Sequence, residues 1–327
     1  MPFLLIVIIA IALLFDFLNG LHDSSNIVAT MISSRALSPQ KALALTAAAE
    51  FAGPFLFGVA VATTIGSEVV QPAAISSGVI VAALSSAIAW NLITWYLGWP
   101  SSTSHALIGG LIGAVTVAAG FDTVEVAGLN KVLVALFLSP VLGLIVGYLM
   151  LKALYFLSRG ASPKVNTVFR RGQLVTSLAL ALSHGTNDAQ KTMGIIAMAM
   201  VTTGYTAEFH VPWWVITMSA GAIALGTATG GWRLIKTLGG KFFKIRPIHA
   251  FGSQMSSAAI ILGAALLGGP VSTTQVVSSA IMGAGAADRV SKVRWTVARD
   301  IAVAWVLTIP IAALLAAVLY FVLDLLF

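Results

Sequence analysis

Long apolar runs, separated by short polar connections, make up almost the whole chain. A membrane-spanning helix needs about 20 residues, so most of these runs are long enough to cross a bilayer, while the eighth and ninth are marginal. The first and sixth are too long for one simple helix and contain a glycine–aspartate motif, so we expect each to be a broken helix. The ten predicted segments are 2–33, 41–65, 73–97, 101–119, 131–157, 172–203, 212–231, 248–268, 271–287 and 297–326.

Two short motifs occur twice, once in each half of the chain. Residues 20–23 read Gly-Leu-His-Asp, and residues 185–188 read Gly-Thr-Asn-Asp, 165 positions later. Residues 100–105 read Pro-Ser-Ser-Thr-Ser-His, and residues 270–275 read Pro-Val-Ser-Thr-Thr-Gln, 170 positions later. Each copy therefore places an aspartate and a hydroxyl cluster inside apolar runs, where polar groups are costly and indicate a functional site.

A third match supports a duplicated unit. Gly53 and Gly58 recur as Gly221 and Gly226, 168 positions later. A duplicated membrane unit with buried polar clusters is typical of a transporter. The predicted organisation is transmembrane repeat 1 at 1–160, a cytoplasmic linker at 161–171 and transmembrane repeat 2 at 172–327, which together form one transport unit.

Composition agrees with a membrane protein. Of the 327 residues, 58% are hydrophobic and 9% are charged, which leaves too much apolar surface for a water-soluble domain. The net charge of +7 comes from Lys and Arg in short loops between the apolar runs, so it indicates membrane topology and not nucleic-acid binding. The chain has no cysteine, which excludes disulfides and thiolate metal sites.

Loop charges predict that the two halves have opposite orientations. The first connection of half one carries Arg35 and Lys41, whereas its counterpart carries Glu208 and no Lys or Arg. The second connection of half one carries only Glu68, whereas its counterpart at 233–246 carries five basic residues. Because basic loops stay in the cytoplasm, both termini are expected outside, and the repeats have inverted topology.

The sequence therefore predicts an all-α polytopic membrane protein with two inverted-topology repeats, broken helices and possible re-entrant hairpins. Segments three and four, like segments eight and nine, form either two spans or one re-entrant hairpin. Either choice changes the number of crossings by two, so the inversion holds in both cases. The expected location is the plasma or inner membrane, with lipid as the surrounding solvent.

The paired aspartates are the first candidates for chemistry. Asp23 and Asp188 lie beside glycines, with Asn26 and Asn187 close in sequence. Carboxylate and amide oxygens beside a broken helix can replace the water shell of a small cation or carry a proton. We therefore expect these four residues to bind a coupling cation, with Asp23 and Asp188 as metal ligands if that cation is Na⁺. The alternative is that each aspartate caps a helix end.

The hydroxyl clusters are candidates for an anion site. Each cluster follows a proline, which is the pattern of a helix start with free backbone amides. A helix N-terminus inside a membrane attracts anions, and hydroxyls add neutral donors. The alternative is plain helix capping. The predicted anion-binding residues are Ser101, Ser102, Thr103, Ser104, Ser272, Thr273 and Thr274.

With both motif pairs in this order, the chain resembles the inorganic phosphate transporter (PiT) family over essentially its whole length. Residues 183–191 resemble its bacterial low-affinity branch in particular. The resemblance implies phosphate uptake coupled to a cation through two inverted repeats in a homodimer. It also implies that Asp23 and Asp188 are the signature aspartates, and that the Ser/Thr clusters bind phosphate. Bacterial members often work beside a small cytosolic PhoU-like protein, a possible partner here.

Two residues depart from the commoner family signature. His22 replaces the first Asn of copy one, and Lys191 replaces the last Asn of copy two. A fixed ammonium at Lys191 can bind phosphate directly or form a salt bridge to Asp23 or Asp188. His22 can titrate near neutral pH or simply bond a helix end. Both changes favour H⁺, or a neutral metal–phosphate complex, over Na⁺ as the coupling chemistry.

Further polar residues lie close to these motifs. Glu50 is an intramembrane acid with no basic neighbour, and Met218 occupies the matching place, so Glu50 is either protonated and structural or part of the ion path. The family resemblance implies the ion path, because members of the family carry a functional Glu here. His105 and Gln275 occupy corresponding positions after the hydroxyl clusters and either orient the site or contact the ligand. Gln190, like His105 and Gln275, is expected to orient the site or to be linked to proton transfer. His184 is expected to be a satisfied helix-end residue.

The favoured function is therefore secondary active import of inorganic phosphate by alternating access, with no cofactor besides the coupling H⁺ or Na⁺. A sulfate or other oxyanion symporter would use the same hydroxyls. An intramembrane aspartyl protease also has two buried aspartates, but it leaves the matched hydroxyl clusters unexplained, so we expect no enzyme. A passive channel would not need two such carboxylates. No nucleic-acid partner is expected.

Overall fold

The computed structural model describes residues 1–232, 234–235 and 244–326, and this part of the chain is almost entirely helical. Its helices begin and end within a few residues of the predicted segments, so the all-α prediction is confirmed. The first half comprises α1 (Phe3–Ser33), α2 (Pro39–Phe57), α3 (Ala60–Thr63), the short helices η1 (Thr64–Glu68) and η2 (Pro72–Ala74), α4 (Ser77–Leu97), α5 (Thr103–Ala119), η3 (Phe121–Thr123) and α6 (Val126–Leu157).

The second half repeats this order. The loop before it spans 158–164, shorter than the linker predicted at 161–171, because residues 165–171 already belong to the first helix. Arg233, Lys236 and Lys241 of the predicted basic loop lie outside the described residues. The helices of this half are α7 (Val165–Thr202), α8 (Trp213–Thr229), α10 (Pro247–Leu266), α11 (Thr273–Asp288), η4 (Val290–Lys292) and α12 (Trp295–Leu326).

The two Asp-bearing helices are not broken at their glycines, so that prediction is wrong. Both α1 and α7 run straight through the motif. The glycines serve close packing instead: a Cβ on Gly20 would lie 2.1 Å from the carbonyl oxygen of Ile223, and one on Gly185 would lie 2.3 Å from that of Glu50. The motif therefore keeps helix geometry while a neighbouring helix touches its backbone.

The same contacts correct the alignment of the two repeats. Gly226 meets Phe17 in the way that Gly53 meets Leu182, so the partner of Gly53 is Gly226 and not Gly221. Nothing lies within 4 Å of a Cβ added to Gly221. On this alignment Glu50 corresponds to the buried Ile223, whereas Met218, its expected partner, is 42% exposed.

The actual breaks lie elsewhere. Helix α2 ends at Gly58, whose φ of 80° favours glycine, and the chain bends by 76° into α3 and η1. Gly98 and Gly268, with φ of 69° and 72°, end α4 and α10 in the same left-handed conformation. These turns produce two helical hairpins, α4–α5 and α10–α11.

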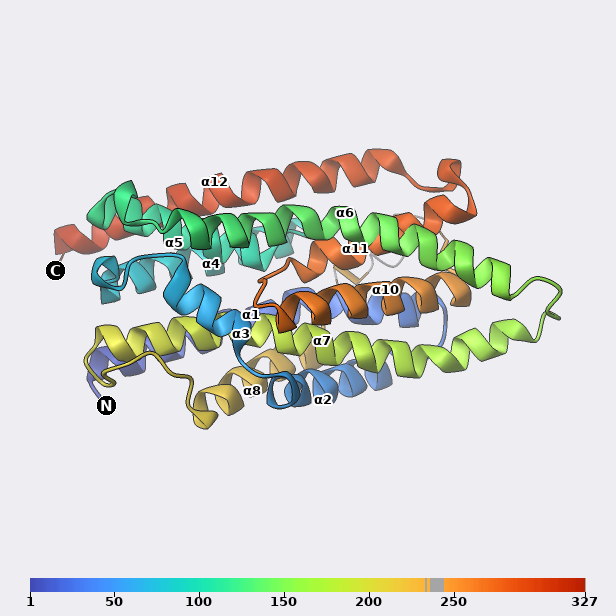
Figure 1. Cartoon of the computed structure of the whole chain (residues 1–327), viewed down its shortest axis with the longest axis horizontal. Helices are drawn as coiled ribbons and strands as arrows, with labels where there is room; N and C mark the ends of the chain where they lie inside the picture. The colour runs from blue at the N-terminus through green and yellow to red at the C-terminus, as the bar shows by residue number, and fades with distance from the viewer. Residues whose placement is uncertain (233, 236–243, 327) are drawn as a thin grey trace.

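Figure 1 shows that the two hairpins enter the molecule from opposite ends and stop near its middle. Helix α5 has 17 residues and α11 has 16, which at 1.5 Å per residue is about 25 Å, less than a bilayer core. The short second helices and the central position of the tips favour re-entrant hairpins over paired spans. The second helix of each hairpin, α5 or α11, therefore begins near the middle of the molecule.

The halves interlock as an inverted pair. Helix α5 packs on α12, and α11 packs on α6, while α1 pairs with α8 and α2 with α7. A Cβ on Gly109 of α5 would lie 2.5 Å from the carbonyl oxygen of Ile309, and one on Gly113 would lie 2.1 Å from that of Ala313, so this pair of glycines lets α5 pack closely on α12. Both termini lie at one end of the molecule, and the α6–α7 loop lies at the other (Figure 1).

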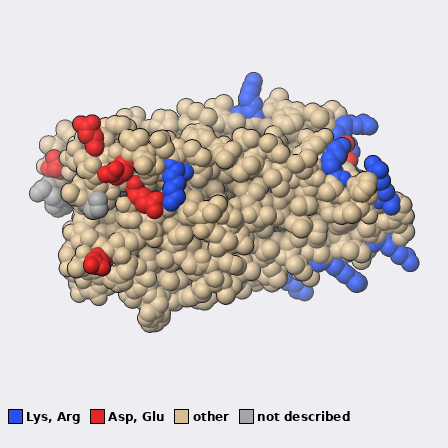
Figure 2. Space-filling model, viewed as in Figure 1, with Lys and Arg blue, Asp and Glu red and all other residues tan. Residues whose placement is uncertain are grey.

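By length and hydropathy alone, α1, α4, α6 and α12 are long and apolar enough to cross a membrane among the described helices, with α2 and its bent continuation as a fifth candidate. Of these, α4 ends at a hairpin tip near the middle of the molecule. Figure 2 shows most visible Lys and Arg at the end that carries the α6–α7 loop, and Asp and Glu at the end that carries the termini. The chain is a multi-pass membrane protein whose two ends differ in charge.

Candidate functional site

The two aspartates meet at the centre of the molecule, facing the starts of the two re-entrant helices. Asp23 on α1 and Asp188 on α7 are completely buried. The hydroxyl of Thr273, the first residue of α11, is 2.9 Å from Asp188 Oδ2 and 3.4 Å from Asp23 Oδ2. Thr103, the first residue of α5, is 3.4 Å from Asp23 Oδ2. One pair of carboxylates thus lies between two helix N-termini.

Further donors complete the shell around Asp23. Thr274 Oγ1 donates to Asp23 Oδ1 at 2.8 Å and in turn accepts from Asn26 Nδ2 at 3.0 Å. His22 Nδ1 lies 2.9 Å from Asp23 Oδ1, which leaves its Nε2 without a described partner. The residues placed here by sequence are therefore brought together, and they use hydroxyl hydrogens rather than backbone amides to hold the carboxylate.

His184 lies at the centre of the site, not at a satisfied helix end as expected. Its Nε2 is 3.1 Å from Asp188 Oδ2 and 3.8 Å from Asp23 Oδ2, and its Nδ1 is 2.8 Å from Glu50 Oε1. The ring thus links both signature aspartates to Glu50, and all four side chains are fully buried. The signal was its spacing: His184 precedes Asp188 by four residues, one helical turn.

Lys191 neutralises part of this negative charge. Its Nζ forms a short ion pair with Asp188 Oδ1 and donates to Ser104 Oγ at 2.6 Å and to the Val271 carbonyl at 3.1 Å. The side chain is 1% exposed. The predicted salt bridge is therefore present, and the same ammonium also reaches both hairpin tips.

The tips of the two hairpins touch each other, and α7 contacts one of them. Ser104 Oγ donates to the Val271 carbonyl at 3.1 Å across the tips, and Asn187 Nδ2 of α7 donates to the Gly269 carbonyl at 3.1 Å. His105 Nε2 and Gln275 Nε2 lie 3.4 Å apart. Because His105 and Gln275 occupy matching positions in the two repeats, their contact marks the pseudo-twofold axis. The site lies on that axis.

Oxygen atoms without hydrogen bonds offer cation ligands. Within the described chain, Oδ1 of Asn26 and Oδ1 of Asn187 have no partner although both residues are buried. One ligand atom each from Asp23, His184 and Asp188 lies within 4.8 Å of the others. These groups suit a small cation or a proton, and the imidazole among them suits a proton better than Na⁺, which prefers oxygen.

Some predicted site residues hold the hairpins instead of facing the aspartates. Ser101 Oγ is 2.7 Å from Thr94 on α4. Ser102 and Ser272 cap α5 and α11, and Ser102 also bonds His105 Nδ1 at 2.6 Å. Gln190 Oε1 accepts from Val61 at 2.8 Å, just after the α2–α3 bend. The capping interpretation therefore applies to Ser102 and Ser272, whereas Thr103, Thr273 and Thr274 face the aspartates.

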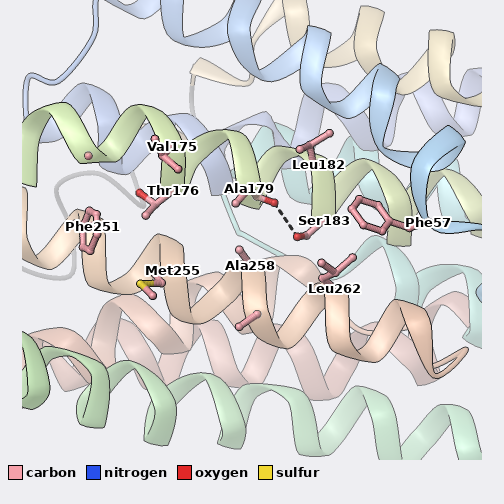
Figure 3. Close-up of a pocket in the computed structure, with 12 residues that line it drawn as sticks. Phe57, Val175, Thr176, Ala179, Leu182, Ser183, Phe251, Met255, Ala258 and Leu262 are labelled. Carbon is pink, nitrogen blue, oxygen red and sulfur yellow. Dashed lines mark hydrogen bonds between the residues drawn. The ribbon is translucent and has the colours of Figure 1, made fainter.

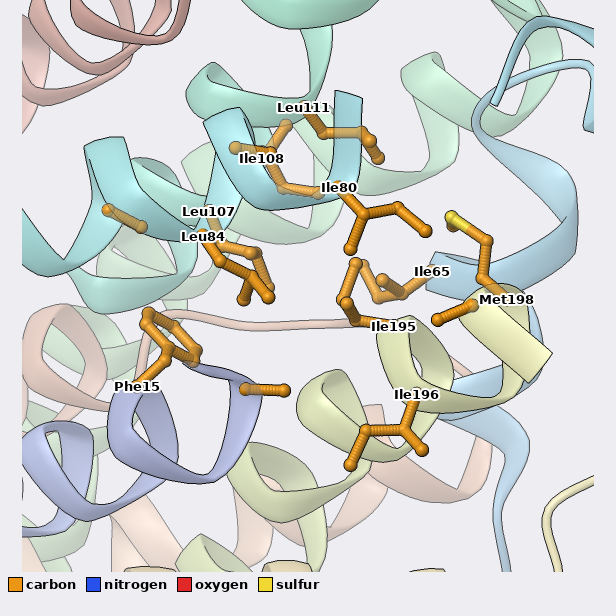
Figure 4. Close-up of a cluster of buried hydrophobic side chains, with 14 of the residues drawn as sticks. Phe15, Ile65, Ile80, Leu84, Leu107, Ile108, Leu111, Ile195, Ile196 and Met198 are labelled. Carbon is orange, nitrogen blue, oxygen red and sulfur yellow. The ribbon is translucent and has the colours of Figure 1, made fainter. Parts of the chain in front are cut away.

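Apolar layers close the site. Figure 4 shows Phe15 pointing toward Leu84 and Leu107, with Ile195 and Ile196 of α7 nearby. This cluster lies between the aspartates and the end that carries the termini. On the other side, a second buried cluster includes Ile27, Met31, Leu180, Val276 and Val277. The structure is an occluded state.

A groove of about 620 Å³ between α7 and α10 is apolar and does not belong to this site (Figure 3). Its few hydroxyls are already used, since Ser183 donates to the Ala179 carbonyl at 2.7 Å and Thr176 donates to Gln254 at 2.6 Å. It therefore has no free donor for an anion.

The carboxylate Asp16 was missed in the sequence. It is fully buried on α1, and neither of its oxygens has a hydrogen-bond partner in the described chain. Asn19, about one helical turn further along, is also buried, and neither polar atom of its amide has a hydrogen-bond partner in the described chain. Their spacing of seven and four residues before Asp23 places them on its face of the helix, a signal visible in the sequence.

Sequence comparison agrees with this geometry. A model described as "Phosphate transporter family" matches residues 19–163 and 158–316. The chain belongs to the phosphate transporter family. It is 46% identical to a Bacillus subtilis protein named "Probable low-affinity inorganic phosphate transporter", over 99% of this chain and 98% of that one. A Rhizobium meliloti protein of the same name is also 46% identical, over 98% and 97%.

A solved structure also matches. It is titled "The sodium-dependent phosphate transporter", with a TM-score of 0.92, 26% identity and full coverage of both chains. Membership of the family confirms the predicted resemblance and the prediction of a transporter rather than an enzyme. The two stretches matched by the family model overlap at the α6–α7 loop, in agreement with two repeats.

The Lys191–Asp188 pair gives a stability prediction. Lys191→Met leaves Asp188 buried without its counter-ion, which costs roughly 3–5 kcal/mol and lowers the melting temperature in detergent. Lys191→Met/Asp188→Asn recovers part of that loss. Lys292→Met is the matched control: it removes a half-exposed partner of Asp288, worth at most about 1 kcal/mol. Equal melting temperatures for the Lys191 and Lys292 single variants contradict a charge-neutralising role for Lys191.

Proposed function

We propose that this protein imports inorganic phosphate together with a cation, by alternating access. The observation that carries the proposal is the pair of hydroxyls at the start of α11, which donate to Asp188 and Asp23 in the occluded state. These are neutral donors at a helix N-terminus, the arrangement that binds phosphate. They are occupied by the protein's own carboxylates.

Competition for these donors explains coupling. Phosphate at mid-depth needs the hydroxyls and amides at the starts of α5 and α11, so the carboxylates must give them up. Two like charges 4 Å apart repel by about 4 kcal/mol at an effective dielectric constant of 20. Phosphate therefore enters only when H⁺ or Na⁺ takes over Asp23 and Asp188. Substrate and cation bind together because neither is stable there alone.

Charge transfer across the membrane requires the same coupling. Phosphate is largely divalent at neutral pH, and the cell interior is negative, so inward movement needs accompanying positive charge. Asn26 and Asn187 supply amide oxygens for that cation, and Glu50 acts through His184. The Lys191 ammonium contacts both Asp188 and Ser104. Phosphate bound at the start of α5 would therefore contact this ammonium as well. A neutral metal–phosphate complex is accommodated by the same oxygens.

Alternating access follows from the inverted hairpins. Contacts such as Ser104 with Val271 join the two tips, and each tip belongs to a different repeat. Motion of one repeat bundle against the other would separate the tips from one side at a time. The homodimer and the PhoU-like partner expected from the family resemblance stay predictions.

Uptake into proteoliposomes tests the proposal. Asp23→Asn and Asp188→Asn each abolish uptake of labelled phosphate. A neutral amide does not bind the coupling cation, so cation binding can no longer free the hydroxyl donors for phosphate. The control is Asp122→Asn, on the exposed α5–α6 connection, which transports normally. Imposing Na⁺ and H⁺ gradients separately identifies the cation, and excess sulfate tests the substrate. Normal uptake by both site variants would exclude this mechanism.

We further propose that the basic end of the molecule is cytoplasmic and that both termini are outside. The chain has no cysteine, so single cysteines report on orientation cleanly. In intact cells, an impermeant maleimide labels Asp122→Cys on the α5–α6 connection and not Ser162→Cys on the α6–α7 loop. Inside-out vesicles reverse the pattern. Labelling of Ser162→Cys from outside means that the orientation is the opposite one.

A further inference from the structure

Asp16 is a second buried acid that the site around Asp23 does not use. It lies two helical turns before Asp23 on the same face of α1, about 10 Å nearer the terminal end at 1.5 Å per residue. It is 0% exposed, and its two oxygens have no hydrogen-bond partner in the part of the chain that the structure describes. Asn19 lies between the two acids with its amide equally unpartnered.

An ionised carboxylate cannot remain in such a place uncompensated. Transfer of an isolated charge from water into a low-dielectric interior is strongly unfavourable, so the group holds a proton or a cation. Thr192 on α7 is the hydroxyl next to Asp16, and its Oγ1 likewise has no hydrogen-bond partner in the described chain. Phe15 beside it belongs to the apolar cluster that excludes water on this side (Figure 4).

Charged groups near Asp16 come from two helices. Asp188 and Lys191 lie on α7, and Glu50 lies on α2. Of the helices that also pack on α1, α8 has no titratable residue, and α4 has only Tyr96, which is exposed near its C-terminal end. Helices α10 and α11 carry theirs at the base of their hairpin. Two acids and one base therefore surround Asp16, and none forms an ion pair with it.

The surroundings suit a proton better than a metal ion. Hard metal cations such as Mg²⁺ and Ca²⁺ take about six or more oxygen ligands. A protonated carboxylic acid, by contrast, needs no ligand from the surrounding side chains. The group of potential metal ligands in the described chain comprises Asp23, His184 and Asp188, and does not include Asp16. Asp16 stands apart from that group.

We propose that Asp16 is a proton site of the transport cycle, loaded from the outer side and emptied to the inner side, separate from the phosphate site. The inference rests on the proposed phosphate import and makes H⁺ one of its coupling ions. In each cycle the carboxylate takes one proton when the outer side opens and returns to the ionised form when the inner side opens. The apolar cluster between Asp16 and the outer surface keeps the proton from leaking in the occluded state.

Asp16→Asn separates proton coupling from phosphate binding. In proteoliposomes the variant loses phosphate accumulation driven by an inward proton gradient, and phosphate addition no longer acidifies the lumen, as followed with an entrapped pH dye. Counterflow of labelled against unlabelled phosphate is retained, because exchange does not require the proton to leave. Asp122→Asn behaves as wild type in all three assays. Asp16→Glu, which keeps an ionisable proton, retains accumulation.

The other outcomes overturn the proposal. Wild-type accumulation by Asp16→Asn under a proton gradient shows that Asp16 carries no coupling proton. Loss of counterflow in a variant with a wild-type melting temperature assigns Asp16 to the phosphate site. Loss of only sodium-driven uptake assigns it to Na⁺. If Asp16→Asn does not fold, failure of Asp16→Glu to accumulate phosphate refutes the role. Absence of both uptake and counterflow in the wild type refutes phosphate transport itself.

Discussion

Two carboxylates buried together in the middle of a membrane need donors or positive charge around them. The structure supplies both from two re-entrant helices that start at mid-depth, one from each half of the chain. Thr273 and Thr274 donate to the aspartates, and Lys191 pairs with Asp188. The hairpins, the inverted repeats and the apolar layers above and below all serve this arrangement, because each keeps the charge away from lipid and water.

The two repeats differ most in the ionisable residues around the aspartates. Asn19 of the first repeat corresponds to His184 of the second, Asn26 corresponds to Lys191, and Glu50 corresponds to Ile223. The matching threonines Thr103 and Thr273 contact Asp23 and Asp188, but the ionisable groups are distributed unequally around the aspartates. His184 links both aspartates to Glu50, and Asp16 has no acidic counterpart, since Ala181 occupies its place. This asymmetry places the titratable groups unevenly along the path from one membrane face to the other.

Much of the fold and most of the site could be predicted from sequence because their signals are local or duplicated. Apolar runs located the helices, and the matched Asp and Ser/Thr motifs located the four patches that meet. The unbroken course of α1 and α7 could not be predicted, because a glycine that breaks a helix and one that admits a neighbouring backbone look alike. The role of His184 depends on Glu50 of another helix, and the repeat alignment on which glycine touches which carbonyl. Both depend on contacts between helices that are far apart in the sequence.

The central claim is that phosphate binds between the starts of α5 and α11, in exchange for carboxylate contacts. An anomalous-scattering structure with arsenate, a heavier analogue of phosphate, tests it most directly. The account predicts one anomalous peak within hydrogen-bonding distance of Thr103 and Thr273, with Asp23 and Asp188 no longer bonded to the α11 hydroxyls. A peak elsewhere, with the carboxylate–hydroxyl contacts intact, would contradict it.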